Sequence, residues 1–243
     1  MIAIFTDFGV VGPYTGQVKA VLQRDAPGVP VIDLMSDAPS FAPRAAAYLL
    51  AALVAPFPEE TVFLAVVDPG VGNPNREPLL VRALDRWFVG PGNGLFEIVC
   101  RRGPCACWRI DWRPPQLSET FHGRDLFAPV AARVARGDEI QKTEVDFTPD
   151  PNFPDDLTEV IYIDAFGNAM LGVRGQTVDR GMRIDVSEHR GVNWARTFSE
   201  VSVGQAFWHV NAHGLVEISV NQGDASARLG LTVGSGVKIL AGS

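Results

Sequence analysis

The first half of the sequence alternates between short apolar segments of strand-like composition and longer segments with helical spacing. This alternation constrains the fold more than any other feature. Strands are predicted over residues 2–7, 29–34 and 61–68, and helices lie between them over 15–25 and 43–57. Continuous apolar strands that alternate with helices are typical of a parallel sheet covered on both faces. We therefore predict a mainly parallel α/β sandwich.

The composition changes after residue 145. The segment DFTPDPNFPDD (146–156) is rich in Pro and Asp, and with its prolines it can neither continue a helix nor pair in a central strand. Beyond it, short strand-like segments are separated by Gly-rich turns, which is typical of a small barrel or sandwich. We predict an α/β N-terminal domain over 1–145, a linker over 146–156 and a smaller C-terminal β-barrel domain over 157–243.

Charge and hydropathy exclude several classes of protein. The net charge of −7 argues against a nucleic-acid partner or an anionic membrane surface. The longest apolar run, AAAYLLAALVAPF, has 13 residues and is too short to span a bilayer. The opening segment MIAIFTDFG has no basic region, so we expect no signal peptide and a cytoplasmic location.

The cysteines form one short cluster at Cys100, Cys105 and Cys107. An odd number of cysteines fits a reducing compartment better than a disulfide scaffold. A structural zinc site needs four ligands, and neither a nearby His nor a second Cys pair follows the cluster. The sequence therefore predicts reduced cysteines and no metal.

Two aspartates follow predicted strands of the sheet. Asp7 ends the first strand and Asp68 ends the third, and each precedes a loop that contains glycine. Ligands in open α/β sheets bind beyond the carboxyl ends of the strands. Either aspartate alone could simply cap a turn. Two of them at one edge predict a polar cleft.

His122 lies beside a predicted helix start in the segment FHGRDLF, near Arg124 and Asp125. The positive potential of a helix N-terminus favours a neutral imidazole. A capping or surface histidine is the alternative. The loop GPGNGLF (90–96) is weak as a phosphate loop, because it lacks the lysine of a P-loop and the full dinucleotide fingerprint.

Several separated motifs occur together in one order. They are TDFG (6–9), DPGVG (68–72), GPGNGLF (90–96), FHGRDLFAP (121–129), YIDAFGNAM (162–170) and VNAHGLVEISVNQGDAS (210–226). With these motifs the chain resembles the S-adenosyl-L-methionine hydrolase (adenosine-forming) family, also called SAM hydroxide adenosyltransferases, which are related to the fluorinase and chlorinase. The resemblance covers nearly the whole chain.

The resemblance implies a homotrimer with sites between subunits, and cleavage of S-adenosylmethionine by water to adenosine and methionine without a cofactor. Asp68, Arg76 and His122 match the family's water-handling triad, with Arg76 placed by aligning Pro78 on the family's proline. The matched substrate-binding positions are Asp7 at the ribose, Asp164 near the methionine amine, Phe166 and Asn168 at the nucleoside, and Asn211 in a loop at the adenine and the amino-acid end.

Three positions depart from the family pattern. Gly12 and Gly92 stand where the family usually has Asp, and Ala212 stands where it often has Ser. These changes concern recognition of the methionine end more than the reacting centre. The sequence leaves open which triad member is the base.

Three alternatives for function remain. The first is a non-catalytic nucleoside-binding module. The second is a halide-using transferase, which Asp68 disfavours because the halide-using relatives carry an aromatic or small neutral residue there. The third is a metal-dependent phosphoesterase, for which the sequence offers too few clustered ligands.

Overall fold

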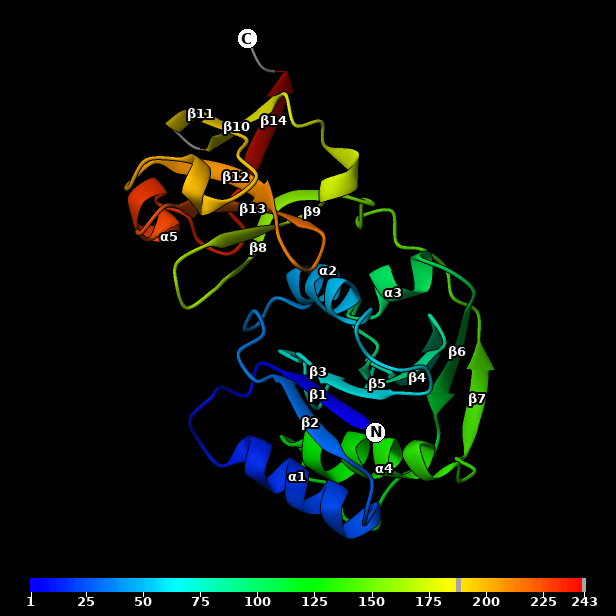
Figure 1. Cartoon of the computed structure of the whole chain (residues 1–243). Coiled ribbons are helices and arrows are strands. Elements are labelled where there is room, and N and C mark those ends of the chain that lie inside the picture. The colour runs from blue at the N-terminus through cyan, green and yellow to red at the C-terminus, as the bar shows by residue number, and fades with distance from the viewer. Residues whose placement is uncertain (187–188, 242–243) are drawn as a thin grey trace. The chain divides into compact units, whose positions relative to one another are not determined.

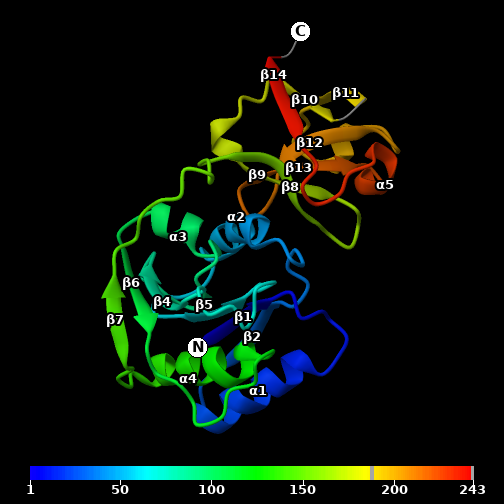
Figure 2. The same ribbon diagram turned by 180° about the vertical axis from the view of Figure 1, so that it is seen from behind.

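In the computed structural model, which describes residues 1–186 and 189–241, the chain folds into two units (Figures 1 and 2). The first comprises Met1–Leu50 and Val54–Pro151, and the second comprises Ala51–Leu53 and the chain from Asn152 onward. Residues 146–156 between them form neither helix nor strand. Within the described residues, no helix is both long enough and apolar enough to cross a bilayer.

The first unit is built on a seven-stranded sheet of order β2-β1-β3-β5-β4-β6-β7. Its strands are β1 (Ile2–Thr6), β2 (Val31–Met35), β3 (Val62–Val66), β4 (Pro78–Ala83), β5 (Arg86–Pro91), β6 (Cys105–Ile110) and β7 (Lys142–Val145). The strands β2, β1, β3 and β5 are parallel neighbours. The remaining pairs, β5 with β4, β4 with β6 and β6 with β7, are antiparallel.

Helices cover both faces of this sheet, which confirms the predicted α/β class. Helices α1 (Tyr14–Asp25) and α4 (Ala128–Arg136) lie on one face, and α2 (Pro43–Leu53) and α3 (Glu97–Arg101) lie on the other (Figures 1 and 2). Val18 and Leu22 of α1 are fully buried in one core with the strand residues Ile4 and Leu64. Burial of each such side chain contributes roughly 1.5–3 kcal/mol.

The second unit contains two small antiparallel sheets. The first sheet comprises β8 (Leu157–Ile163), β9 (Ala169–Arg174), β12 (Ala206–Val210) and β13 (Leu215–Val220), and the second comprises β10 (Met182–Val186), β11 (His189–Asn193) and β14 (Val237–Ala241). A bridge from Glu159 to Gly236 joins β8 to the start of β14, and a bridge from Trp194 to Trp208 joins the end of β11 to β12. The sheets thus meet at both edges around one apolar core, as the strands of a barrel do.

Candidate functional site

The two aspartates at strand ends lie side by side in the first unit. β1 and β3 are parallel neighbours, with Thr6 opposite Val66, so Asp7 and Asp68 emerge at the same edge of the sheet. Burial raises the pKa of Asp7, and the amide of Phe41 donates to its Oδ2 at 3.3 Å. The structure therefore brings together the carboxylates that the sequence predicted at this edge.

Asp68 and Arg76 form a buried ion pair. Nη1 of Arg76 donates to Oδ2 of Asp68, and the two side chains are only 8% (Arg76) and 5% (Asp68) exposed. Burial raises the pKa of Asp68 despite the opposing charge of Arg76, and the nearby charge of Asp7 raises it further. The pair therefore holds a partly desolvated carboxylate that is more basic than an ordinary aspartate.

One oxygen of the Asp68 carboxylate has no hydrogen-bond partner among the described residues. Oδ1 of Asp68 is buried and accepts no hydrogen bond of ordinary geometry from the described residues. The amide of Gly70 lies near enough to lower the Asp68 pKa, but it does not satisfy that oxygen. A buried acceptor without a partner costs about 1–3 kcal/mol. A water or substrate hydroxyl at this point would remove that cost.

His122 completes the cluster from the other side of Arg76. It immediately precedes the π-helical turn η1 (Gly123–Phe127), at the helix start that the sequence predicted. Its Nδ1 lies 3.3 Å from Nη2 of Arg76. A guanidinium can only donate, so Nδ1 accepts and the imidazole proton resides on Nε2. Burial, and then the charges of Arg76 and Arg113, lower the pKa of His122 and keep it neutral.

A cavity of about 270 Å³ borders Arg76 and His122. Arg109, Arg113 and Leu117 contribute to its other walls. Arg76 and His122 therefore line this cavity, whereas Asp68 does not and is buried.

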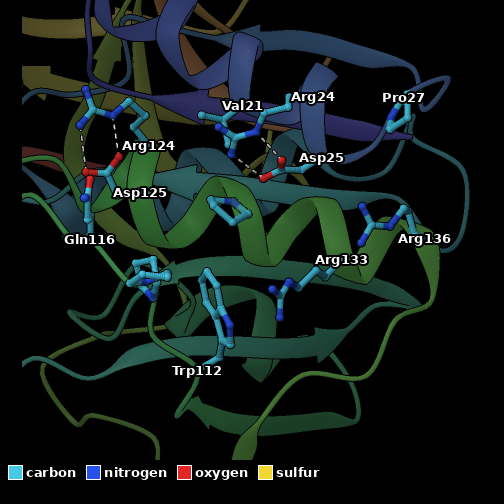
Figure 3. A pocket seen from close by; sticks show the side chains of 13 residues that line it. Val21, Arg24, Asp25, Pro27, Trp112, Gln116, Arg124, Asp125, Arg133 and Arg136 are labelled. Carbon is cyan, nitrogen blue, oxygen red and sulfur yellow. Dashed lines mark hydrogen bonds and ion pairs between the residues drawn. The ribbon is translucent and has the colours of Figure 1, made fainter.

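A second cavity, of about 830 Å³, lies elsewhere in the first unit, between α1, α4 and the segment that contains Trp112 (Figure 3). It contains none of the predicted site residues. Its arginines are largely neutralised, because Arg24 pairs with Asp25 and Arg124 pairs with Asp125. This cavity is not the candidate site.

The other predicted binding residues lie in the second unit. Asp164 closes a tight turn: its Oδ1 accepts from the amides of Phe166 and Asn168 at 2.9 Å, and its Oδ2 accepts from the Asn168 side chain at 2.9 Å. The turn presents the Phe166 ring, which is 78% exposed. Asn211 likewise orders its own turn, because its oxygen accepts from the amides of His213 and Leu215.

Sequence reasoning missed several residues that shape the site. The Asn93 side chain donates to the carbonyl of Val67 at 2.8 Å and fixes the chain directly before Asp68. Phe8, Tyr14 and Phe121 form an aromatic cluster, with ring centroids 5.4–6.2 Å apart. Their only signal in the sequence is position, since Phe8 follows Asp7 and Phe121 precedes His122.

The departure at Gly92 has a steric reason. A Cβ there would lie 2.7 Å from the carbonyl oxygen of Glu77 and 3.1 Å from the Leu79 side chain. The aspartate that the family usually carries does not fit this backbone. The structure offers no comparable account of Ala212.

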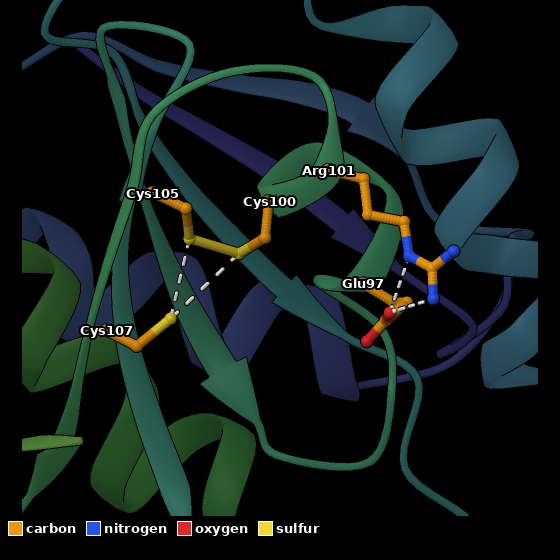
Figure 4. Close-up of a disulfide and its surroundings, with 5 residues drawn as sticks. All are labelled: Glu97, Cys100, Arg101, Cys105 and Cys107. Atoms are coloured by element: carbon orange, nitrogen blue, oxygen red, sulfur yellow. Dashed lines mark hydrogen bonds and ion pairs between the residues drawn. A yellow bond between two sulfur atoms is a disulfide. The ribbon is translucent and has the colours of Figure 1, made fainter. Parts of the chain in front are cut away.

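The cysteines differ from the prediction. Cys100 and Cys105 are joined by a disulfide, and Cys107 is a buried free thiol (Figure 4). Cys105 and Cys107 are two residues apart on β6, so their side chains share a face, and Cys100 reaches them from α3. Spacing in the sequence could not show this convergence.

Comparisons with known proteins agree with the motifs. A model of the SAM hydroxide adenosyltransferase N-terminal domain matches residues 2–144, and a model of the C-terminal domain matches residues 158–238. A Thermus thermophilus protein named (R)-S-adenosyl-L-methionine hydrolase is 38% identical, over 97% of both chains. A Salinispora arenicola protein of the same name is 34% identical, over 99% of this chain and 98% of its own.

Two solved structures have a similar fold. The crystal structure of an uncharacterized conserved protein from Thermotoga maritima has a TM-score of 0.88 and 31% identity, over 98% of this chain and all of that one (100%). A conserved hypothetical protein from Thermus thermophilus has a TM-score of 0.78 and 35% identity, over 98% of this chain and 99% of its own. The predicted family is thus confirmed, and the chain belongs to the SAM hydroxide adenosyltransferase family.

Proposed function

We propose that this protein hydrolyses S-adenosyl-L-methionine by attack of water on the ribose C5′, giving adenosine and L-methionine. Relatives of nearly the same length are named as hydrolases of the (R) form of this compound. The observation that carries the proposal is the buried, unpartnered Oδ1 of Asp68 beside the Arg76–His122 contact. Among the described residues, this basic acceptor has no hydrogen-bond donor.

The reaction needs a nucleophile more than it needs an acid. A sulfonium sulfur leaves as a neutral thioether and requires no proton. Water is a poor nucleophile, so it must be oriented in line with the breaking bond and deprotonated as it attacks. Attraction between a hydroxide-like oxygen and the sulfonium is stronger in a dry site than in bulk water. No step of this mechanism calls for a cofactor.

The geometry favours Asp68 as the base. Arg76 stays protonated at neutral pH and cannot accept a proton. His122 accepts from Arg76 through Nδ1, so its Nε2 carries the proton and can donate to the water but not take its proton. Oδ1 of Asp68 is then the remaining acceptor in the cluster. Arg76 holds the carboxylate and stabilises the developing hydroxide.

The remaining predicted residues take binding roles in this proposal. Asp7 accepts from the ribose hydroxyls at the sheet edge. Phe166 and Asn168 line the nucleoside pocket and Asp164 lies near the methionine amine, while Asn211 shapes the loop at the adenine and the amino-acid end. The family resemblance supports these roles, and the turn that presents Phe166 fits an apolar contact.

Product analysis tests the proposal directly. We expect (R)-S-adenosyl-L-methionine in water labelled with heavy oxygen to yield equal amounts of methionine and adenosine, with the label on the 5′ oxygen of adenosine. The (S) diastereomer should react much more slowly. A halide-using enzyme would instead give a 5′-halogenated nucleoside in chloride or fluoride, and a non-catalytic binding module would give no product. Either outcome would reject the hydrolase proposal.

We also propose a cytoplasmic homotrimer. In the first unit, Val10, Val11 and Phe41 follow the strand ends near Asp7 and are 80%, 87% and 80% exposed. Apolar side chains gathered beside a polar site are typical of a surface that a partner subunit covers. Light scattering at micromolar concentration should give three times the mass of one chain. A monomer that retained full activity would contradict shared sites.

A further inference from the structure

All three cysteines of the chain converge on one point in the first unit. Their sulfur atoms lie within 4.8 Å of one another. Sγ of Cys107 lies 3.5 Å from Sγ of Cys105 and 3.9 Å from Sγ of Cys100 (Figure 4). None of the residues proposed for hydrolysis belongs to this cluster.

The fold holds the cluster firmly. Cys107 is central in β6, which is paired with β4 on one side and β7 on the other. Cys100 and Cys107 are 4% and 5% exposed. The position of the sulfur atoms is therefore set by the sheet and by α3, and not by a mobile loop.

The spacing of the sulfur atoms matches a shared metal ion. A zinc–sulfur bond is about 2.3 Å long, which places thiolates on one ion roughly 3.8–4.0 Å apart. The contacts of Cys107 with its two neighbours already fall near this separation. The third pair, Cys100 and Cys105, comes apart when its disulfide is reduced.

The surroundings admit an ion and a fourth ligand. A cavity of about 310 Å³ is bordered by Cys100, Cys107 and Glu97. The Glu97 carboxylate is buried and already has a cationic partner, since it pairs with Arg101 at 2.7 Å. A bound cation would stabilise the thiolate form of the buried Cys107.

We propose that Cys100, Cys105 and Cys107 bind one zinc-like, thiophilic metal ion through three thiolates, with a water from the adjoining cavity as the fourth ligand. A thiol reductant first converts the Cys100–Cys105 disulfide to two thiols and is itself oxidised to a disulfide. Binding of the divalent ion then displaces three protons from the three thiols. In a reducing compartment, clustered cysteines are more often metal ligands than disulfide partners.

The test is a metal titration of the reduced protein. The chain is reduced with a phosphine, freed of reductant without air, and titrated with Zn²⁺ against a chromophoric chelator. Co²⁺ serves as a second probe, since thiolate ligands give it a charge-transfer absorption. We expect one ion per chain, a charge-transfer band, affinity that rises with pH, and little binding by the oxidised protein.

Single substitutions distinguish a site with three cysteine ligands from a site with two. Cys100→Ala, Cys105→Ala and Cys107→Ala should each weaken Zn²⁺ binding by more than the roughly 10–100-fold that loss of an outer-shell partner costs. A dithiol site made only of the disulfide partners would leave Cys107→Ala with the affinity of the parent chain, which would overturn the proposal. The proposal would also be overturned if the reduced parent protein bound Zn²⁺ no more tightly than the triple alanine variant does.

Two further measurements keep the result unambiguous. Thermal melting identifies any variant that fails to fold, and the comparison of reduced with oxidised parent protein then decides the question without that variant. Hydrolysis of S-adenosylmethionine should be unchanged in Cys107→Ala. Failure of the metal proposal is therefore distinguishable from failure of the proposed activity.

Discussion

Asp68→Asn should slow hydrolysis of S-adenosylmethionine by about 10²–10⁴, the usual contribution of positioned acid–base catalysis. Asparagine keeps the size of the side chain but cannot take a proton from water. Substrate binding should change far less, because the lost interaction is made mainly in the transition state. Single-turnover rates and equilibrium binding, measured on the same preparation, check both parts.

Asp7→Asn is the matched control. It makes the same chemical change at the same sheet edge, on a residue proposed to bind the ribose hydroxyls. It should weaken binding of adenosine more than binding of the 2′-deoxy nucleoside, since a charge-assisted hydrogen bond contributes roughly 1.5–3 kcal/mol. It should slow the chemical step much less than Asp68→Asn does. If the Asp68→Asn protein folds and hydrolyses S-adenosylmethionine at the rate of the parent protein, Asp68 has no catalytic role and only shapes a turn.

The sequence predicted the sheet edge because topology determines it. Asp7 and Asp68 each follow an apolar strand, and parallel neighbours end at the same edge. The antiparallel half of the sheet carried a weaker signal. The β4–β5 hairpin turns at Leu84 and Asp85, whose φ angles are 52° and 57°. Such turns usually contain Asn-Gly or Asp-Gly, so the pair Leu-Asp does not predict a hairpin turn from the sequence.

The partners of Asp68 were predictable only in part. Arg76 and His122 are 46 residues apart, and Arg76 lies in a loop, so no periodicity places them together. Family motifs pointed to them, whereas their hydrogen bonding came from the structure. The contact of Nδ1 with Arg76 fixes the imidazole tautomer, and that tautomer favours Asp68 as the base. The sequence identifies the side chains that can donate or accept hydrogen bonds, but it does not show which of them are partners.

Arg76→Met should destabilise the fold and abolish most activity. The change leaves a buried carboxylate, 5% exposed, without its counter-charge. Breaking a buried ion pair in this way costs about 3–5 kcal/mol. We expect the lower end of that range, because the shorter side chain extends the neighbouring cavity toward Asp68 and admits water. Denaturant unfolding at several pH values measures the loss.

The pH dependence identifies the cause of this loss. Burial already raises the pKa of Asp68 in the folded protein, and Arg76 opposes that rise. Without Arg76 the folded-state pKa increases further, so the folded state binds the proton more tightly than the unfolded state does. The stability deficit of Arg76→Met should therefore be small in acid, where Asp68 is protonated in both states, and should grow as the pH rises toward neutrality.

The double variant Arg76→Met with Asp68→Asn completes the experiment. With the buried charge removed, the second substitution should restore much of the stability that the first one lost at neutral pH, although the double variant should remain inactive. A double-mutant cycle on the free energies of unfolding gives the coupling between the two side chains. A deficit that does not vary with pH and is unchanged in the double variant would mean that Arg76 acts through packing alone. The ion pair would then have no part in holding the base.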